Sequence, residues 1–292
     1  MAERVALTGW RLPVLFKLAV LFLLLAPLWV PNLLSAWLGP PPEAAESPAV
    51  VEADFLRMPH ERVAPDGQPS DAPLRGEIEL HASHERLSEA AIRRNLQPYE
   101  PATRSIAMSS RLTGERVFVA APGADGRLHV PNAYMLARPP YRVRQAWMPL
   151  FAVADRLRYQ LDHEQHNGRE EVWLTSRQAW VGARGDCEDH AILLADWLIE
   201  MGLDARVALG MHGRTGHAWV IMLHNGREYL LEATSKRKLK RWSAYPLART
   251  LPDYHPDMMF NRETLWLNTG SQFTVEYAGD RWKPMLTFRS AG

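Results

Sequence analysis

Hydrophobic and polar residues follow a helical period in several stretches of the chain. Apolar positions three and four residues apart predict an amphipathic helix over residues 144–161. A shorter helix is predicted to begin with Ser176 as its cap, run through Val181 and end at Gly182. The clearest pattern predicts a third helix over residues 187–201.

The helix over residues 187–201 has one apolar and one polar side. Asp186 is suited to its N-cap, with Asp189 three residues later in an arrangement similar to a capping box, and Gly202 is suited to follow its C-terminus. Cys187 begins the stripe that is predicted to be buried. The opposite face, predicted to be exposed to solvent, carries Asp189, Asp196 and Glu200.

Apolar runs after this helix predict strands joined by tight turns. Asn225-Gly226 is a strong hairpin signal, and it joins residues 217–223, expected to be covered on both faces, to residues 227–234. Further strands are predicted over residues 116–121, 127–130, 205–210, 264–268 and 272–277. A helix followed by an antiparallel meander predicts an α+β fold.

Residues 1–38 contain the long apolar stretch of the chain. Basic residues lie at its start, the last of them Lys17, and acidic residues come first after it. This asymmetry favours a cytoplasmic N-terminus. We therefore expect a signal anchor or transmembrane segment, which makes the chain a single-pass inner-membrane protein whose folded part faces the periplasm.

The chain beyond the apolar stretch divides into a linker and a folded region. Residues 39–75 contain eight prolines and little apolar periodicity, which is typical of an extended linker. Residues 76–292 are predicted to form the folded domain, with its core in residues 143–234.

Composition narrows the class of function. The 34 basic residues nearly balance the 33 acidic ones, for a net charge of +1, which argues against a nucleic-acid partner. A single cysteine excludes an intramolecular disulfide and a thiolate-rich zinc or iron–sulfur site. Cys187 therefore acts without a partner thiol.

The predicted hairpin fixes which side chains share a face. A two-residue turn at Asn225-Gly226 pairs Trp219 with Glu232 and His217 with Thr234. Glu232 is then the diagonal neighbour of His217, with backbones roughly 7–8 Å apart, within reach of a long side chain. The sequence thus predicts an acid beside an imidazole.

Cys187 adds a nucleophile to this pair. At a helix N-terminus, the dipole and free N–H groups favour a thiolate and can stabilise an oxyanion. Cys187 as nucleophile, His217 as base and Glu232 as orienting acid would suit thiol acyl chemistry. The structural alternative is a buried cysteine, a core histidine and a surface acid.

Two metal sites are also compatible with these residues. Asp186, Glu188 and Asp189 offer the carboxylate oxygens that calcium prefers, although helix capping explains the same residues. A zinc set is the other alternative, and it would use Cys187, His190, His212 and His217.

Three segments of the sequence resemble a known family. The runs GDCEDHAILLADWLIEMGLDARVALG, GHAWVIM and REYLLEAT are similar to the core of the transglutaminase-like superfamily, and most similar to the bacterial transglutaminase-like cysteine proteinases. The resemblance covers residues 173–234 and implies a papain/transglutaminase-like core, with the nucleophile at a helix N-terminus packed on an antiparallel sheet. It implies Cys187 as nucleophile, His217 as base and Glu232, where the family more often has Asp, as acid. The resemblance implies an enzyme that requires no cofactor. Some members of the family respond to calcium, which favours the calcium site over helix capping for Asp186, Glu188 and Asp189.

These expectations combine into one function and two alternatives. We expect a membrane-anchored, thiol-dependent acyl-transfer enzyme, a cysteine peptidase that cleaves amide bonds of a protein or peptide substrate. A transglutaminase that crosslinks proteins would use the same acyl-enzyme. A non-enzymatic binding or assembly module at the cell envelope would keep the fold without the chemistry.

Overall fold

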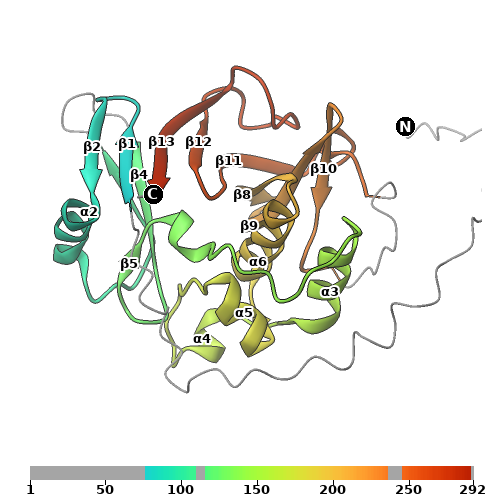
Figure 1. The fold of residues 1–292 in the computed structure, drawn as a ribbon, viewed down its shortest axis with the longest axis horizontal. Helices are drawn as coiled ribbons and strands as arrows, with labels where there is room; N and C mark the ends of the chain where they lie inside the picture. Colours follow the sequence, from blue (N-terminus) through green and yellow to red (C-terminus); the bar gives the residue numbers. More distant parts are fainter. Residues whose placement is uncertain (1–75, 110–115, 236–244, 291–292) are drawn as a thin grey trace, which may run out of the picture. The chain divides into compact units, whose positions relative to one another are not determined.

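Eight of the described strands form one antiparallel sheet, in the order β10-β9-β8-β11-β12-β13-β1-β2 (Figure 1). The computed structural model describes residues 76–109, 116–235 and 245–290, which all lie within the compact unit Arg62–Gly292. The strands are β1 (Gly76–Leu80), β2 (Glu85–Ser88), β8 (Asp204–His212), β9 (Thr215–His224), β10 (Arg227–Leu231), β11 (Tyr254–Phe260), β12 (Thr264–Asn268) and β13 (Trp282–Ser290).

The hairpin β9–β10 has the register that the sequence predicts. His224 pairs with Arg227 across Asn225-Gly226, and the pairing continues to Val220 with Leu231. Both turn residues have positive φ, 51° and 68°, as this turn requires. β9 lies between β10 and β8, so its middle residues are buried on both faces as expected. The partner strand ends at Leu231 rather than at Thr234.

Smaller strands flank the large sheet. β3 (Ile106–Ser109), β4 (Arg116–Pro122) and β5 (Leu128–His129) form an antiparallel group in which the predicted hairpin of β4 and β5 is present. β6 (Arg158–Tyr159) and β7 (Arg184–Gly185) form a parallel pair. The strand predicted over residues 272–277 is absent. Thr274 N instead closes a turn on Ser271 O, and Tyr277 N donates to the Glu228 carboxylate.

The described helices are short apart from one. They are α2 (Glu89–Leu96), α3 (Met148–Arg156), α4 (Asp162–Gln165), α5 (Ser176–Gly182) and α6 (Cys187–Glu200), with 3-10 turns at Gln97–Tyr99, Pro131–Tyr134 and Ala248–Thr250.

Two helices differ from the sequence prediction at their ends. α3 covers only the nine residues Met148–Arg156, rather than residues 144–161, because Pro149 occupies its first turn and Arg158 leaves the helix to pair with β7. α5 is capped by Thr175 rather than by Ser176. The Thr175 hydroxyl accepts from Gln178 N, and the Gln178 side chain accepts from Thr175 N.

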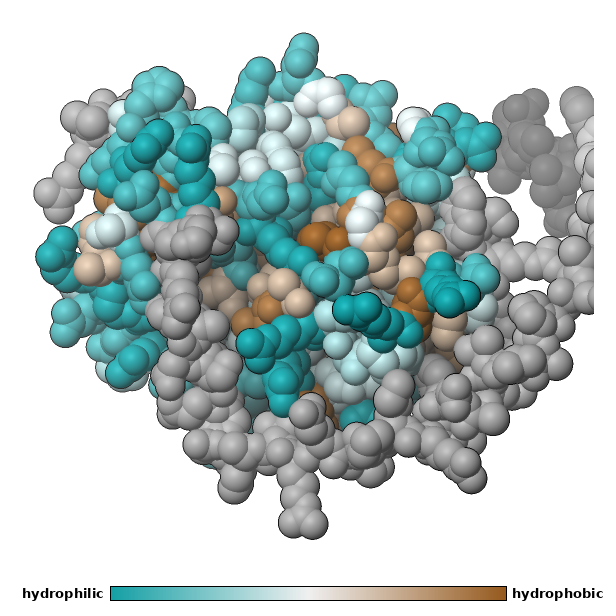
Figure 2. Space-filling view, in the orientation of Figure 1, coloured by the Kyte–Doolittle hydropathy of each residue, from teal (hydrophilic) through white to brown (hydrophobic). Residues whose placement is uncertain are grey.

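The sheet has an apolar layer on each face. On one face α6 packs against β8 and β9, and the core there includes Leu194, Leu198, Val207 and Val220 (Figure 1). A second cluster contains Trp219, Met259, Tyr277 and Trp282. Burying each large apolar side chain stabilises the fold by roughly 1.5–3 kcal/mol, which fixes α6 on the sheet. The outer surface of the face in Figure 2 is mostly hydrophilic, with small apolar patches.

The polar side of α6 is not exposed as the sequence predicts. Asp189 is completely buried and Asp196 is 2% exposed, and of the three expected surface acids only Glu200 faces solvent. Leu174 N donates to Asp189, and Leu136 N and Ser176 Oγ donate to Asp196. The helix is therefore covered on this side by other segments of the chain.

The membrane segment and linker predicted over residues 1–75 lie outside the described residues. Among the residues that the structure describes, none of the helices combines the length and apolar character of a membrane span.

Candidate active site

Cys187 is the first residue of α6, directly after the short strand β7. A Cβ on Gly185 would lie 2.5 Å from the Asp189 carboxyl, so a side chain at this position would displace the helix start. Asp186 occupies the N-cap position, but its side chain makes no capping hydrogen bond, contrary to the sequence prediction. Its carbonyl oxygen instead accepts from His190 Nδ1 at 2.6 Å.

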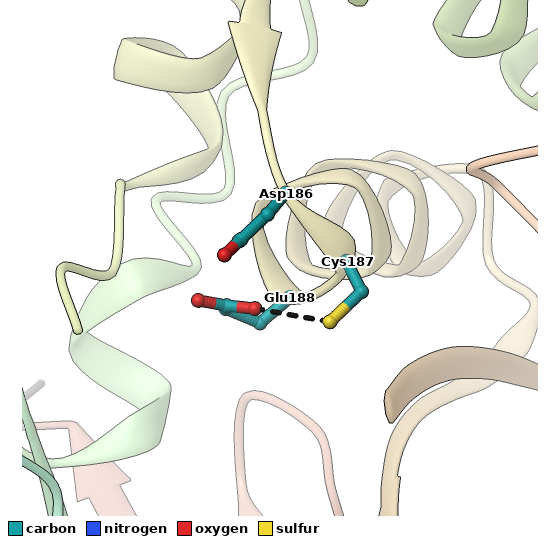
Figure 3. Close-up of side chains that lie close together, drawn as sticks. All are labelled: Asp186, Cys187 and Glu188. Carbon is teal, nitrogen blue, oxygen red and sulfur yellow. Dashed lines mark hydrogen bonds between the residues drawn. The ribbon is translucent and has the colours of Figure 1, made fainter. Parts of the chain in front are cut away.

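The Cys187 side chain is half-buried beside an acidic residue. Its thiol donates to Glu188 Oε2, with 3.3 Å between the sulfur and the oxygen. Figure 3 shows this bond, with the carboxyl group of Asp186 facing that of Glu188. The nucleophile candidate therefore lies at the border of an acidic cluster.

His217 and Glu232 are in direct contact. His217 Nε2 donates to Glu232 Oε2 at 2.8 Å, and both side chains are mostly buried. The other carboxylate oxygen accepts from Thr234 N at 3.1 Å and from Thr234 Oγ1 at 2.7 Å. The acid-beside-imidazole geometry follows the hairpin register, although Glu232 lies just beyond the last paired residue of β10.

The charges of this pair stabilise each other. Burial alone would lower the pKa of His217, but hydrogen bonds to the Cys187 side chain and to Glu232, together with their charges, raise it to about 10. Burial alone would raise the pKa of Glu232, but the His217 and Thr234 hydrogen bonds lower it. The structure thus bonds His217 to Glu232, and the Cys187 side chain is among the groups that raise the pKa of His217.

The carboxyl groups of Asp162, Asp186, Glu188 and Asp189 form a cluster next to Cys187. Burial and mutual repulsion raise the pKa of Asp186, Glu188 and Asp189, and raise that of Asp162 to about 7. Asp186 Oδ1 and Asp189 Oδ2 are buried with no hydrogen-bond partner among the described residues. Oxygen atoms of Asp162, Asp186 and Asp189 lie within 4.8 Å of one another, as do ligand atoms of Asp186, Cys187 and Glu188.

The predicted calcium ligands therefore fall into two overlapping groups that share Asp186. The zinc alternative is not supported. Among the described residues, the groups close enough to hold a metal contain no histidine. His190 Nδ1 is engaged by a backbone carbonyl, and the rings of His212 and His217 lie 5.5 Å apart.

The structure adds residues to the site that the sequence reasoning did not single out. Tyr254 donates to Glu232 Oε2 at 2.9 Å, and Asp162 joins the carboxyl cluster. Thr234 was placed beside Glu232 by the register, but its two hydrogen bonds were not predicted. No local signal marks Tyr254, which comes from a distant strand.

Residues 171–285 match the family model of the CEP76 peptidase-like domain. The centrosomal protein of 76 kDa from Xenopus tropicalis is 44% identical over 55 residues, which are 18% of this chain and 8% of that protein. The human protein of the same name is 42% identical over 55 residues, with the same shares. Human protein CC2D2B is 27% identical over 127 residues, 41% of this chain and 8% of its own length. The matched region thus spans less than a tenth of each of these relatives.

Among solved structures, LapG of Legionella pneumophila is similar at 20% identity and a TM-score of 0.35, over 43% of this chain and 69% of that one. Its calcium-bound form gives the same identity and score, over 43% and 71%. The similarity of residues 171–285 is to a peptidase-like domain, and this range contains all three of Cys187, His217 and Glu232.

Proposed function

We propose that this chain is a thiol-dependent acyl-transfer enzyme, and specifically a cysteine peptidase that cleaves amide bonds of a protein or peptide substrate. Cys187 is the nucleophile, His217 the base and Glu232 the acid that orients and charges the imidazole. The observation that carries the proposal is the bond of His217 Nε2 to Glu232 Oε2 at 2.8 Å, and the Cys187 side chain among the groups that raise the pKa of His217 supports it. This is the arrangement that activates a thiol for acyl transfer.

The proposed reaction follows from this geometry. His217 takes the proton of Cys187, and the thiolate attacks the carbonyl carbon, forming a carbon–sulfur bond and a tetrahedral oxyanion. Backbone N–H groups at the start of α6 are available to stabilise that oxyanion. The imidazolium then protonates the departing amine as the carbon–nitrogen bond breaks. Water attacks the resulting thioester, His217 takes its proton, and the acid is released with the thiol restored.

Two other functions share this fold. An amine in place of water would give a transglutaminase that crosslinks proteins. A binding or assembly module would use the domain as a surface, and the centrosomal names of the curated relatives favour this candidate. Cys187 would be dispensable for the module, whereas both enzymes require it.

A calcium ion suits the carboxyl cluster of Asp162, Asp186, Glu188 and Asp189. Calcium–oxygen bonds of about 2.4 Å place two ligands of one ion within about 5 Å of each other, and ligand atoms lie within 4.8 Å of one another in each of two groups that share Asp186. Buried carboxyl oxygens of Asp186 and Asp189 have no hydrogen-bond partner among the described residues. A bound cation would stabilise the ionised carboxyl groups and thereby fix the start of α6 that presents Cys187.

The proposed location is the cell envelope. Residues 1–38 would anchor the chain in the inner membrane, and residues 39–75 would link the anchor to the domain in the periplasm. Fractionation of cells that express the full chain tests the anchor, which should bring the chain into the membrane fraction. Protease added to intact spheroplasts tests the location, because a periplasmic domain should be digested. Recovery of the chain in the soluble cytoplasmic fraction would contradict the proposal.

An electrophilic activity probe tests the enzymatic proposal on the full chain. Labelling is expected at Cys187, and His217→Ala is expected to lower its rate about 100-fold or more. His255→Ala is the matched control, because His255 packs against Phe273 rather than against the triad. Labelling that is equal in wild type and His217→Ala would overturn the proposal. Hydrolysis and amine transfer are then separated by supplying a labelled amine with a peptide substrate.

A further inference from the structure

Tyr254 lies beside the proposed triad although it comes from a different part of the sheet. It opens β11, pairs with His212 of β8 and is 7% exposed. Its hydroxyl donates to Glu232 Oε2 at 2.9 Å. Two strands, β9 and β8, separate β10 from β11 in the sheet, so this bond ties Glu232 to a remote strand.

Tyr254 completes the hydrogen bonding of the Glu232 carboxylate. Oε2 accepts from His217 Nε2 and from Tyr254, and Oε1 accepts from the backbone and the hydroxyl of Thr234. Each oxygen thus has two donors, as an ionised carboxylate in a buried site requires. Of these donors, Tyr254 alone shares an oxygen with His217, so it acts on the same atom that orients the imidazole.

The Tyr254 ring contacts three aromatic side chains, one of which is His217 with 6.2 Å between ring centroids. The imidazole of His212 stacks on the Tyr254 ring with 4.1 Å between ring centroids and 14° between planes. The indole of Trp219 meets it nearly perpendicularly, with centroids 5.1 Å apart. Burial and the Glu232 charge raise the pKa of Tyr254, so the phenol stays protonated as a donor. A fixed and permanently protonated donor preorganises its acceptor.

We propose that Tyr254 is a positioning residue of the thiol reaction, which holds the Glu232 carboxylate ionised and directed at His217. The inference deepens the proposed function and depends on it. Tyr254 acts on Cys187 through Glu232 and His217, because its hydroxyl bonds Glu232 and its ring lies beside that of His217. The titratable or charged groups around Glu232 and His217 are Asp186 and Cys187 at the start of α6, Tyr159 on β6, His212 on β8 and Tyr254 on β11.

The test is the pH dependence of Cys187 alkylation by iodoacetamide in the full chain. Cys187 is the single cysteine of the sequence, so the rate of thiol loss reports this site alone. Loss of the Tyr254 hydroxyl makes Glu232 easier to protonate and weakens the support that Glu232 gives to the His217 imidazolium. Tyr254→Phe is expected to slow alkylation about tenfold near pH 6 and less than about twofold near pH 9.5.

Tyr277→Phe is the matched control. Tyr277 is another buried tyrosine of the same apolar cluster, but its hydroxyl accepts from Trp219 Nε1 and does not contact Glu232. The control should leave the alkylation profile of wild type unchanged. If Tyr254→Phe does not fold, as judged by its thermal transition, Tyr254→Met removes the same hydroxyl and takes its place.

A double variant separates positioning from general packing. In the Glu232→Ala background, Tyr254→Phe should change the rate near pH 6 less than about twofold, because the acceptor is gone. An unchanged profile in Tyr254→Phe, an equal shift in Tyr277→Phe or a full effect in the Glu232→Ala background would each overturn the inference. If wild type and His217→Ala have the same alkylation profile, the proposed function itself fails. That result is distinct from the three outcomes above, which concern Tyr254 alone.

Discussion

The Asp196 carboxylate of α6 lies 2.7 Å from the Arg262 guanidinium, Nε to Oδ1, and joins the helix to the turn between β11 and β12. Asp196 also accepts from Leu136 N, Ala137 N and Ser176 Oγ. Arg262 Nη2 also donates to the Asp196 carbonyl oxygen. One buried carboxylate therefore connects three segments that are far apart in the sequence.

Asp196→Leu should destabilise the fold strongly. The substitution leaves a mostly buried guanidinium and buried N–H groups without their acceptor, which costs about 3–5 kcal/mol. Urea unfolding followed by circular dichroism measures the change in free energy. The control is Arg289→Met, which breaks the exposed Arg289–Glu79 pair and should cost less than about 1 kcal/mol. Equal losses in the two variants would contradict the assigned role of Asp196.

Asp196 and Asp189 also show where the sequence pattern stops being informative. A 3.6-residue period places both on the side of α6 away from the sheet, and the helix itself was predicted nearly to its observed ends. The segments that cover this side, around Leu136 and Leu174, lie 15 to 60 residues away. The helical period separates apolar from polar positions within one helix. It does not show whether a polar position faces solvent or a distant segment that donates hydrogen bonds.

His217 gives stability a specific pH dependence. Its folded pKa of about 10 exceeds the ordinary value of 6.5, so its contribution is fully present below about pH 6.5 and is lost as the pH rises through about 10. The difference in Tm between wild type and His217→Gln should therefore be about 4 °C near pH 6.5 and vanish above about pH 10. Thermal unfolding at a series of pH values measures it. His255→Gln should show no such trend, and a difference that grows toward high pH would reverse the predicted sign.

The contact between His217 and Glu232 was predictable because a two-residue turn fixes strand register over short distances. The same reasoning could not reach Tyr254, because β11 joins the sheet through β8 after a long intervening segment. Asp162 was also out of reach. The predicted helix ends at Leu161, one residue before Asp162, whereas α3 stops at Arg156 and Asp162 begins α4. The turn rule therefore predicts the His217–Glu232 contact. The position of Tyr254 beside it depends on the order of distant strands in the sheet, which the sequence pattern does not give.

Calcium should stabilise the domain through the carboxyl cluster. At a calcium concentration about 100 times the dissociation constant, the Tm of the full chain is expected to rise by about 5 °C. Asp162→Asn should abolish most of the rise, whereas Asp125→Asn, a carboxyl change outside the cluster beside His129, should preserve it. Differential scanning fluorimetry with calcium, magnesium and EGTA measures the effect. An equal response in all three conditions would exclude a calcium site here.

Gly210 allows a sharp test of how β8 and β11 fit together. A Cβ at this position would lie 2.1 Å from the His255 carbonyl oxygen and 2.8 Å from Pro256 Cα, both backbone atoms, where the pairing of the two strands shifts register. Gly210→Ala should therefore cost about 1–3 kcal/mol and displace the neighbouring residue Tyr254. Gly216 is the control position. It lies on β9, paired with Met211 of β8, and a Cβ there would meet no atom within 4 Å. Gly216→Ala should thus leave the urea midpoint nearly unchanged, and a loss equal to that of Gly210→Ala would show that strand flexibility, rather than this close approach, requires glycine.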